Sequence, residues 1–315
     1  MNRNVTIIGD GLVGSSTAFT LFLSDLVNTI YLIDLNKEKV EGDVLDMMHG
    51  VSFVNNKTIK VGEYQDILDS KILIITAGAN QKEGETRIDL LNKNIKIFDS
   101  ILNEVKKYLH DELIVLVVTN PVDLLSYFTY KKLNISSNRV IGSGTVLDSS
   151  RLKYLLSLDT KVDAKNIHAY VVGEHGDSEV SVFSLASIGG IKLFDFCKKC
   201  NRCERNEKYQ KIHNEVKNSA YEIINKKGAT FYAIALSCKR IVEAILSDSN
   251  SILTISSYIN NYIDNNINDI YMSFPAVINY QGVREVLNLN YSIKEKETII
   301  ASFSKLNELK NKIKI

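Results

Sequence analysis

The sequence has no marked excess of charge of either sign and no long apolar run. It carries 38 basic and 37 acidic residues among 315, for a net charge of +1. Without a long-range positive field, nucleic acid and anionic membrane are not expected partners. No apolar run reaches the roughly twenty residues that span a bilayer, and the first apolar segment follows Met1 almost at once, which leaves no room for a signal peptide. We therefore expect a cytoplasmic protein.

Cysteine is also scarce, and three of the four cysteines lie in CKKCNRC, at Cys197, Cys200 and Cys203. A structural zinc site usually needs four ligands, and no second CxxC or paired histidines follow at the usual distance. Because basic residues surround these cysteines, we predict an exposed loop with reduced thiols and no metal, with metal binding as the alternative. Cys238 lies in a helical apolar pattern and is expected in the core.

The first half of the chain alternates apolar strands with helical patterns, which predicts a parallel sheet covered by helices on both faces. The expected strands are Val5 to Ile8, Thr29 to Ile33, Ile72 to Thr76, Leu113 to Thr119 and Val140 to Ile141.

The second half changes character near Ser143. We expect strands in HAYVV and SEVSVFSLASI, a long amphipathic pattern from Tyr209 through Leu246, β-rich segments around 252–257 and 272–277, and a charged helix from Lys294. The chain is therefore predicted to be an α/β protein with two domains, residues 1–143 and an α+β domain over residues 144–315.

A glycine-rich turn follows the first expected strand. In VTIIGDGLVGSSTAF, Gly9 permits a tight turn, Gly11 lets a pyrophosphate approach the backbone, and Gly14 lets helix and strand pack closely. Asp34 ends the second apolar run twenty residues after Gly14, where a carboxylate accepts hydrogen bonds from ribose hydroxyls and repels a 2′-phosphate. This pattern favours NAD over NADP. A plain glycine turn, or a helix cap at Asp34, is the alternative.

Acid–base residues come later in the chain. VVGEHGDSEV places His175 between two glycines, twenty-four residues after Arg151 of LDSSR, which also holds Asp148. Histidine exchanges a proton near neutral pH, and a nearby carboxylate raises its proton affinity. Together with arginine, this combination suggests acid–base chemistry on an anionic substrate. The segments ITAGANQKEGETR and VVTNPVDLL, the latter with Asn120, lie near the ends of expected strands, where ligands of open α/β sheets bind.

The motifs GDGLVG, ID, TAGANQKEGETR, TNPVD, GTVLDSSR, GEHGDSE and KKGAT, in this order and spacing, resemble the L-lactate and malate dehydrogenase family, and within it the bacterial L-lactate dehydrogenases. The resemblance covers nearly the whole chain. It implies a Rossmann-type doubly wound NAD-binding domain, an α+β substrate domain and usually a homotetramer.

The resemblance also implies a role for each site residue. His175 would be the general acid/base between pyruvate and L-lactate, and Asp148 would hold and stabilise its imidazole. Arg151 would bind the substrate carboxylate with its planar fork, and Arg87 would polarise the substrate carbonyl beside a closing loop. Further substrate contacts would come from Gln81, Asn120 and Thr230. The NAD contacts would be Gly9, Gly11, Leu12, Val13, Gly14, Asp34, Thr76, Ala77, Gly78, Thr119, Asn120 and Ile234.

Substrate choice is predicted from Gln81. Oxaloacetate has a second carboxylate, whose burial without a partner costs several kcal/mol, and family members that prefer malate carry arginine at this position. Neutral Gln81 favours pyruvate, as expected of an enzyme of fermentative glycolysis. The alternatives are a malate or other L-2-hydroxyacid dehydrogenase, and a catalytically silent NAD-binding protein on the same fold.

Two positions depart from the family pattern. Glu83 stands where many bacterial relatives have proline, in the loop that would close over the substrate. Relatives activated by fructose 1,6-bisphosphate use an arginine and a histidine at positions that here are Lys153 and His168. Lysine meets a phosphate only as a point charge, so activation by the bisphosphate stays open.

Overall fold

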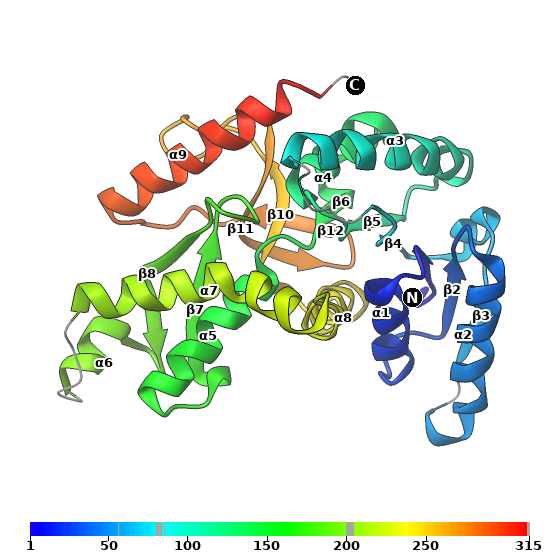
Figure 1. The fold of residues 1–315 in the computed structure, drawn as a ribbon, viewed down its shortest axis with the longest axis horizontal. Coiled ribbons are helices and arrows are strands. Elements are labelled where there is room, and N and C mark those ends of the chain that lie inside the picture. The colour runs from blue at the N-terminus through cyan, green and yellow to red at the C-terminus, as the bar shows by residue number, and fades with distance from the viewer. Residues whose placement is uncertain (56, 80–83, 85, 200–204, 314–315) are drawn as a thin grey trace.

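A nine-stranded sheet forms the centre of the fold (Figure 1). The computed structural model describes residues 1–55, 57–79, 84, 86–199 and 205–313. The strand order is β12-β11-β10-β6-β5-β4-β1-β2-β3. The strands are β1 (Val5–Ile8), β2 (Thr29–Ile33), β3 (Thr58–Val61), β4 (Ile72–Ile75), β5 (Ile114–Val117), β6 (Val140–Gly142), β10 (Ser251–Ile259), β11 (Ile270–Asn279) and β12 (Gly282–Val286).

The first six strands pair in parallel, in the order 3-2-1-4-5-6 of a Rossmann domain. Strands β10, β11 and β12 extend this sheet in antiparallel fashion beyond β6. The predicted α/β class and doubly wound parallel sheet are therefore confirmed. The strand order reverses between β1 and β4, which places a ligand crevice at the carboxyl ends of these strands.

Helices cover both faces of the sheet, and strand β4 shows why its sequence is apolar throughout. Ile72 and Ile74 pack into a core with helices α1 (Leu12–Phe22), α2 (Lys37–His49) and α8 (Tyr232–Leu246). Leu73 and Ile75 pack on the opposite face with α3 (Arg87–Val105) and α4 (Val122–Leu133). A strand buried on both faces has no polar side, so its four residues are all apolar.

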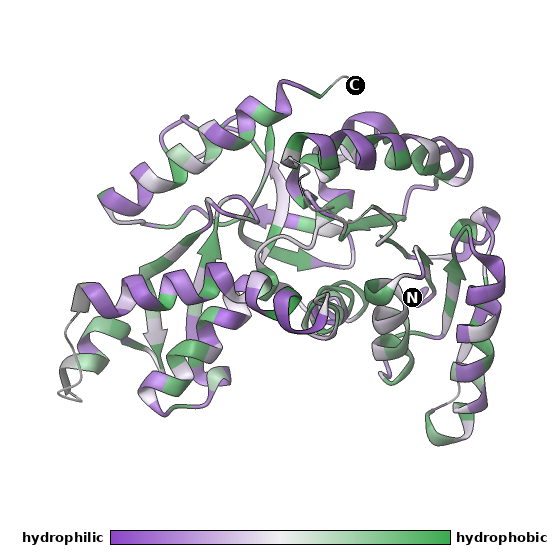
Figure 2. Ribbon diagram, in the orientation of Figure 1, coloured by the Kyte–Doolittle hydropathy of each residue, from purple (hydrophilic) through white to green (hydrophobic). Residues whose placement is uncertain are grey.

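A smaller sheet and three helices form a second group, at the lower left of Figure 1. An antiparallel sheet of β7 (Ile167–Val172), β8 (Val180–Ile188) and β9 (Ile191–Lys192) packs with α5 (Val146–Thr160), α6 (Leu193–Lys199) and α7 (Arg205–Lys227). Helix α9 (Ile293–Lys310) packs against β8 and β11. The short 3-10 helices are η1 (Val51–Phe53), η2 (Tyr64–Asp69), η3 (Lys106–Tyr108), η4 (Ser137–Arg139) and η5 (Ala164–Asn166). Figure 2 shows hydrophobic strands inside and helices with mixed polar and apolar surfaces around them.

Several predictions from the sequence need correction. The amphipathic pattern from Tyr209 through Leu246 is two helices, because Gly228 has φ +85° and a residue in that conformation ends a right-handed helix. The edge strands β3 and β12 were not predicted, since each has an exposed face and lacks a long apolar run. The predicted strands of the parallel sheet are present, with ends that differ by at most two residues.

The cysteine prediction is wrong for one thiol. Cys197 is buried on α6, with its sulfur 3.0 Å from the Tyr209 hydroxyl, rather than exposed in a loop. Cys200 and Cys203 lie outside the described residues, whereas Cys238 is fully buried as predicted. No helix within the described ranges is long and apolar enough to cross a membrane.

Candidate active site

The glycine turn after β1 is shaped by close backbone contacts. Gly9 has φ +108°, and a Cβ there would lie 2.4 Å from the Ala77 nitrogen. A Cβ at Gly14 would lie 1.8 Å from the Gly9 carbonyl oxygen. Any larger residue at either position would therefore force the turn apart.

Gly11 is different, because nothing lies within 4 Å of the position that its Cβ would take. It is the N-cap of α1, and no side chain caps the helix there. The first amides of α1, in Leu12 and Val13, thus begin a helix whose N-terminus faces open space. Backbone amides at a helix N-terminus bind phosphate groups. This arrangement fits the pyrophosphate of a dinucleotide.

Asp34 lies beside this turn, at the end of β2. Its carboxylate accepts the Asp10 amide at 2.7 Å and the Asn36 amide at 3.0 Å. Helix α2 is capped by Asn36, whose side chain accepts the Lys39 amide, so the helix-cap alternative for Asp34 is wrong. The side chain is half-buried, in the position from which a carboxylate can accept ribose hydroxyls.

The loops after β4 and β5 join the glycine turn at the carboxyl ends of the strands. The Thr76 hydroxyl donates to the Gly9 carbonyl at 2.8 Å, and the Thr119 hydroxyl donates to the Ala77 carbonyl at 2.8 Å. Gly78 is needed here, because a Cβ would lie 2.3 Å from the Thr119 methyl carbon. These contacts hold the three strand ends of the predicted coenzyme site together.

Asn94 on α3 was not predicted, although it ties two predicted loops together. Its side chain accepts the Ala79 amide at 2.7 Å and donates to the Asn120 carbonyl at 2.8 Å. It is fully buried. An asparagine in an otherwise apolar helix face was the only signal for it in the sequence.

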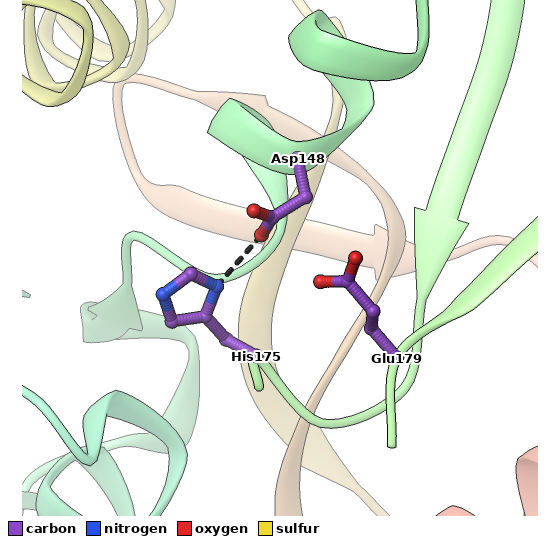
Figure 3. Close-up of side chains that lie close together, drawn as sticks. All are labelled: Asp148, His175 and Glu179. Carbon is purple, nitrogen blue, oxygen red and sulfur yellow. Dashed lines mark hydrogen bonds and ion pairs between the residues drawn. The ribbon is translucent and has the colours of Figure 1, made fainter. Parts of the chain in front are cut away.

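The predicted acid–base residues come together around one carboxylate. His175 Nδ1 lies 2.6 Å from one oxygen of Asp148 (Figure 3). Arg151 donates to the other oxygen at 2.7 Å. Asp148 and Arg151 are one turn apart on α5, whereas His175 comes from the loop after β7. The Asp148 side chain is 2% exposed and that of His175 is 23% exposed. The imidazole is thus held by its Nδ1 and keeps an accessible edge.

Asp148, His175 and Arg151 stabilise one another's charged forms. Burial disfavours the charged imidazolium, but Asp148 outweighs this effect by its charge and hydrogen bond and raises the pKa of His175 to about 9. Burial also acts to raise the pKa of Asp148, but His175 and Arg151 outweigh it and lower that pKa. Asp148 therefore stays ionised beside a protonated histidine at neutral pH.

Local contacts fix the helix and the loop that carry these residues. The Thr145 hydroxyl donates to the Val171 carbonyl, and the Val171 amide donates to Ser149 Oγ at 2.9 Å, which ties α5 to β7. Gly144, before α5, has φ +54°, and a Cβ there would lie 2.3 Å from a backbone nitrogen of β10. The DSSR segment and the histidine loop therefore keep a fixed relative position.

Besides Glu174, which is also buried, two buried acids near His175 were not predicted. Asp123 on α4 accepts the His175 amide at 2.8 Å, and burial raises its pKa to about 6. Glu179, just before β8, is 5% exposed, and burial followed by the charge of Asp148 raises its pKa to about 8. Both residues stand inside motifs that the sequence singled out, but a motif does not say which of its acids is buried. Asp148, His175 and Glu179 are close enough to hold a metal ion, but Asp148 already serves His175 and Arg151.

The other predicted residues are distributed as follows. Asn120 is exposed at the end of the β5 loop, and Thr230 is half-buried just before α8. Ile234 on α8 packs against the same core cluster as Val13. Lys153 is half-buried on α5 and His168 is exposed on β7. Arg87 begins α3, but its side chain and the predicted Gln81 and Glu83 lie outside the described residues.

Comparison with known proteins agrees with this geometry over the whole chain. Residues 3–142 match the lactate/malate dehydrogenase NAD binding domain, and residues 145–315 match the lactate/malate dehydrogenase alpha/beta C-terminal domain. The L-lactate dehydrogenase of Acetivibrio thermocellus is 50% identical over 98% of this chain and 96% of its own length. L-lactate dehydrogenase 1 of Clostridium acetobutylicum is 48% identical over 98% of this chain and 97% of its own length.

Solved structures show the same similarity. The ligand-bound minor L-lactate dehydrogenase of Enterococcus mundtii superposes with a TM-score of 0.95 at 37% identity, over 100% of this chain and 99% of that one. The L-lactate dehydrogenase of Clostridium thermocellum gives a TM-score of 0.88 at 37% identity, over 99% and 100% of the two chains. The chain belongs to the lactate/malate dehydrogenase family of NAD-binding oxidoreductases.

Proposed function

We propose that this chain catalyses the reversible reduction of pyruvate to L-lactate with NADH. The observation that carries this proposal is that one buried carboxylate, that of Asp148, holds both the proton-transferring His175 and the anion-binding Arg151. Similarity to L-lactate dehydrogenases over nearly the full chain supports the same activity.

Each residue in this group has a proposed task. Arg151 binds the substrate carboxylate, because its guanidinium matches the two oxygens with parallel hydrogen bonds. His175 donates its proton to the carbonyl oxygen of pyruvate and takes the hydroxyl proton of lactate in the reverse direction. Asp148 keeps the imidazole in one tautomer and stabilises its charged form. When bound, the nicotinamide coenzyme supplies or accepts the hydride.

The coenzyme is proposed to bind along the crevice between β1 and β4. Open space above Gly11 and the uncapped start of α1 support the pyrophosphate site, and the half-buried carboxylate of Asp34 supports NAD rather than NADP. Ile234, which packs on the same cluster as Val13, is proposed to lie against the nicotinamide ring. Thr230, Asn120 and Arg87 are proposed substrate contacts.

The choice of pyruvate over oxaloacetate is proposed to depend on Gln81. A steady-state panel of pyruvate, oxaloacetate and branched 2-oxo acids, with NADH and with NADPH, tests the assignment directly. Pyruvate with NADH should give the highest kcat/KM.

Gln81→Arg should shift the preference toward oxaloacetate. An unchanged ratio of kcat/KM for oxaloacetate to that for pyruvate would argue against this role of Gln81. NADH binding without reduction of any 2-oxo acid would instead favour the catalytically silent alternative.

We also propose that the chain forms a homotetramer that works in the cytoplasm as part of fermentative glycolysis. Large apolar side chains are exposed on and beside α1 and α2, as expected of a surface that another subunit covers; they are Phe19, Leu23, Leu45 and Phe53. Light scattering after gel filtration should give about four times the chain mass of 35.4 kDa. The proposed domain boundary, between residues 143 and 144, falls beside Gly144 at the start of the turn into α5.

A further inference from the structure

Glu179 is a buried acid that the chemistry above does not use. It directly precedes β8 and is 5% exposed, and its Oε1 has no hydrogen-bond partner among the described residues. In Figure 3 its carboxyl group points toward the pair formed by His175 and Asp148. One ligand atom from each of the three residues lies within 4.8 Å of the others. A purely structural acid would be expected to have partners for both oxygens.

The groups that face Glu179 come from two helices and one loop. Helix α5 supplies Asp148 and Arg151, the loop after β7 supplies His175, and α7 supplies Lys217. Two more titratable groups lie on the same elements: Glu174 accepts from the Ser178 hydroxyl, and His213 on α7 is bonded to Ser181. Among these, Asp148 carries the buried negative charge that would repel an ionised Glu179.

The protonation state of Glu179 sets the charge of the substrate site. With Glu179 neutral, the charges of Asp148, His175 and Arg151 sum to +1 over these three residues. This charge suits a monoanion such as pyruvate. With Glu179 ionised, the charges of these three residues and Glu179 sum to zero, and a second carboxylate lies close to the place where the substrate anion binds.

We propose that Glu179 is a third ionisable group of the acid–base site, which must carry its proton for pyruvate to bind. This inference rests on the proposed function. The proton on Glu179 stays on the protein throughout turnover, whereas the proton on His175 passes to the substrate oxygen. In alkaline solution, where both groups are deprotonated, binding of a pyruvate-like anion must therefore take up two protons from solvent, one onto each residue.

Proton uptake on binding tests this directly. Oxamate, an unreactive monocarboxylate of similar size to pyruvate, is titrated into the enzyme saturated with NADH by calorimetry, in buffers of different ionisation enthalpy. Between pH 7 and 10 the number of protons taken up per site should rise above one toward two. In Glu179→Gln it should not exceed one. A wild-type value that never exceeds one overturns the proposal, and this measurement does not depend on any variant folding.

Kinetics provide an independent measurement. The slope of log kcat/KM for pyruvate against pH should approach −2 at high pH in the wild type and −1 in Glu179→Gln. The ratio of kcat/KM at pH 6.5 to that at pH 10 should be at least tenfold smaller in the variant. Glu179→Asp should keep the two-proton profile, as should Glu174→Gln, which removes a buried acid from the same loop. A slope of −2 in Glu179→Gln would contradict the proposal.

The two proposals fail in distinguishable ways. Reduction of pyruvate with a single ionisation in the wild type would leave the proposed function standing and reject the role of Glu179. No reduction of any 2-oxo acid, together with no binding of oxamate, would reject both.

Discussion

Replacing Asp148 with asparagine should lower the pKa of His175 from above neutral pH to below it. The carboxylate lies 2.6 Å from His175 Nδ1 and is 2% exposed. It raises the histidine pKa from 6.5 to about 9 against the opposing effect of burial. At about 1.4 kcal/mol per pH unit, this corresponds to about 3 kcal/mol of preference for the imidazolium. Without that charge, burial is opposed only by the smaller effects of Asp123 and Glu179, so the pKa should fall to about 6.5 or below.

The loss of activity follows from this shift. At pH 7.5 nearly all wild-type His175 is protonated, whereas about one tenth or less would be protonated in Asp148→Asn. The kcat/KM for pyruvate should therefore fall at least about tenfold, and its decline with pH should begin below 6.5. Lactate oxidation needs neutral His175, so kcat/KM for lactate increases as the pH rises. In Asp148→Asn this increase should occur at lower pH than in the wild type.

Steady-state pH profiles in both directions provide the assay. Asp159→Asn is the matched control, because it makes the same change three turns further along α5, at a residue paired with Lys208. Its profiles should keep the wild-type midpoints. An unchanged midpoint in Asp148→Asn, with activity simply lower at every pH, would refute the electrostatic argument.

The same shift makes a prediction for stability. A raised histidine pKa stabilises the fold fully below the unfolded value of 6.5, and this contribution is lost as the pH rises through about 9. The difference in unfolding free energy between the wild type and Asp148→Asn should therefore narrow between pH 6.5 and 9. Chemical denaturation at several pH values measures it, and a constant difference would contradict the assigned pair.

Three substitutions test the coenzyme site, and one titration tests whether fructose 1,6-bisphosphate activates the enzyme. Gly14→Ala places a Cβ 1.8 Å from a carbonyl oxygen, so it should lower the free energy of unfolding by about 3 kcal/mol or more. Gly11→Ala meets no protein atom and should keep the wild-type melting temperature while weakening NADH binding at least tenfold. Asp34→Ser should raise kcat/KM with NADPH relative to NADH, as measured with saturating pyruvate. Measuring KM for pyruvate at increasing concentrations of fructose 1,6-bisphosphate tests Lys153 and His168. An unchanged KM would exclude activation through these two residues.

Much of the fold and of the site could be predicted because their signals are local. The strands of the parallel sheet are short apolar runs bounded by turn residues, and a strand buried on both faces leaves that signature in the sequence itself. The positions of Gly9, Gly11 and Gly14 follow from a turn that other residues cannot form. The proposed tasks of His175 and Arg151 use chemistry that few other side chains perform.

What the sequence could not determine depends on contacts between distant segments. Gly228 divides one continuous amphipathic pattern into two helices, because its backbone takes a positive φ. Asn94 looks like an ordinary polar helix residue until its amide is found between two loops. Glu179 and Asp123 look like surface acids within their motifs, and only burial raises their pKa values toward neutral pH.

The amino-acid sequence by itself determined the coenzyme turn, the parallel sheet and the set of catalytic residue types, since each is encoded within a few consecutive positions. The tertiary structure decided which carboxyl groups are buried together around His175. The free energy of ionising a carboxyl group depends on the surrounding dielectric and on charges a few ångströms away, and folding brings those charges from helices and loops far apart in the chain.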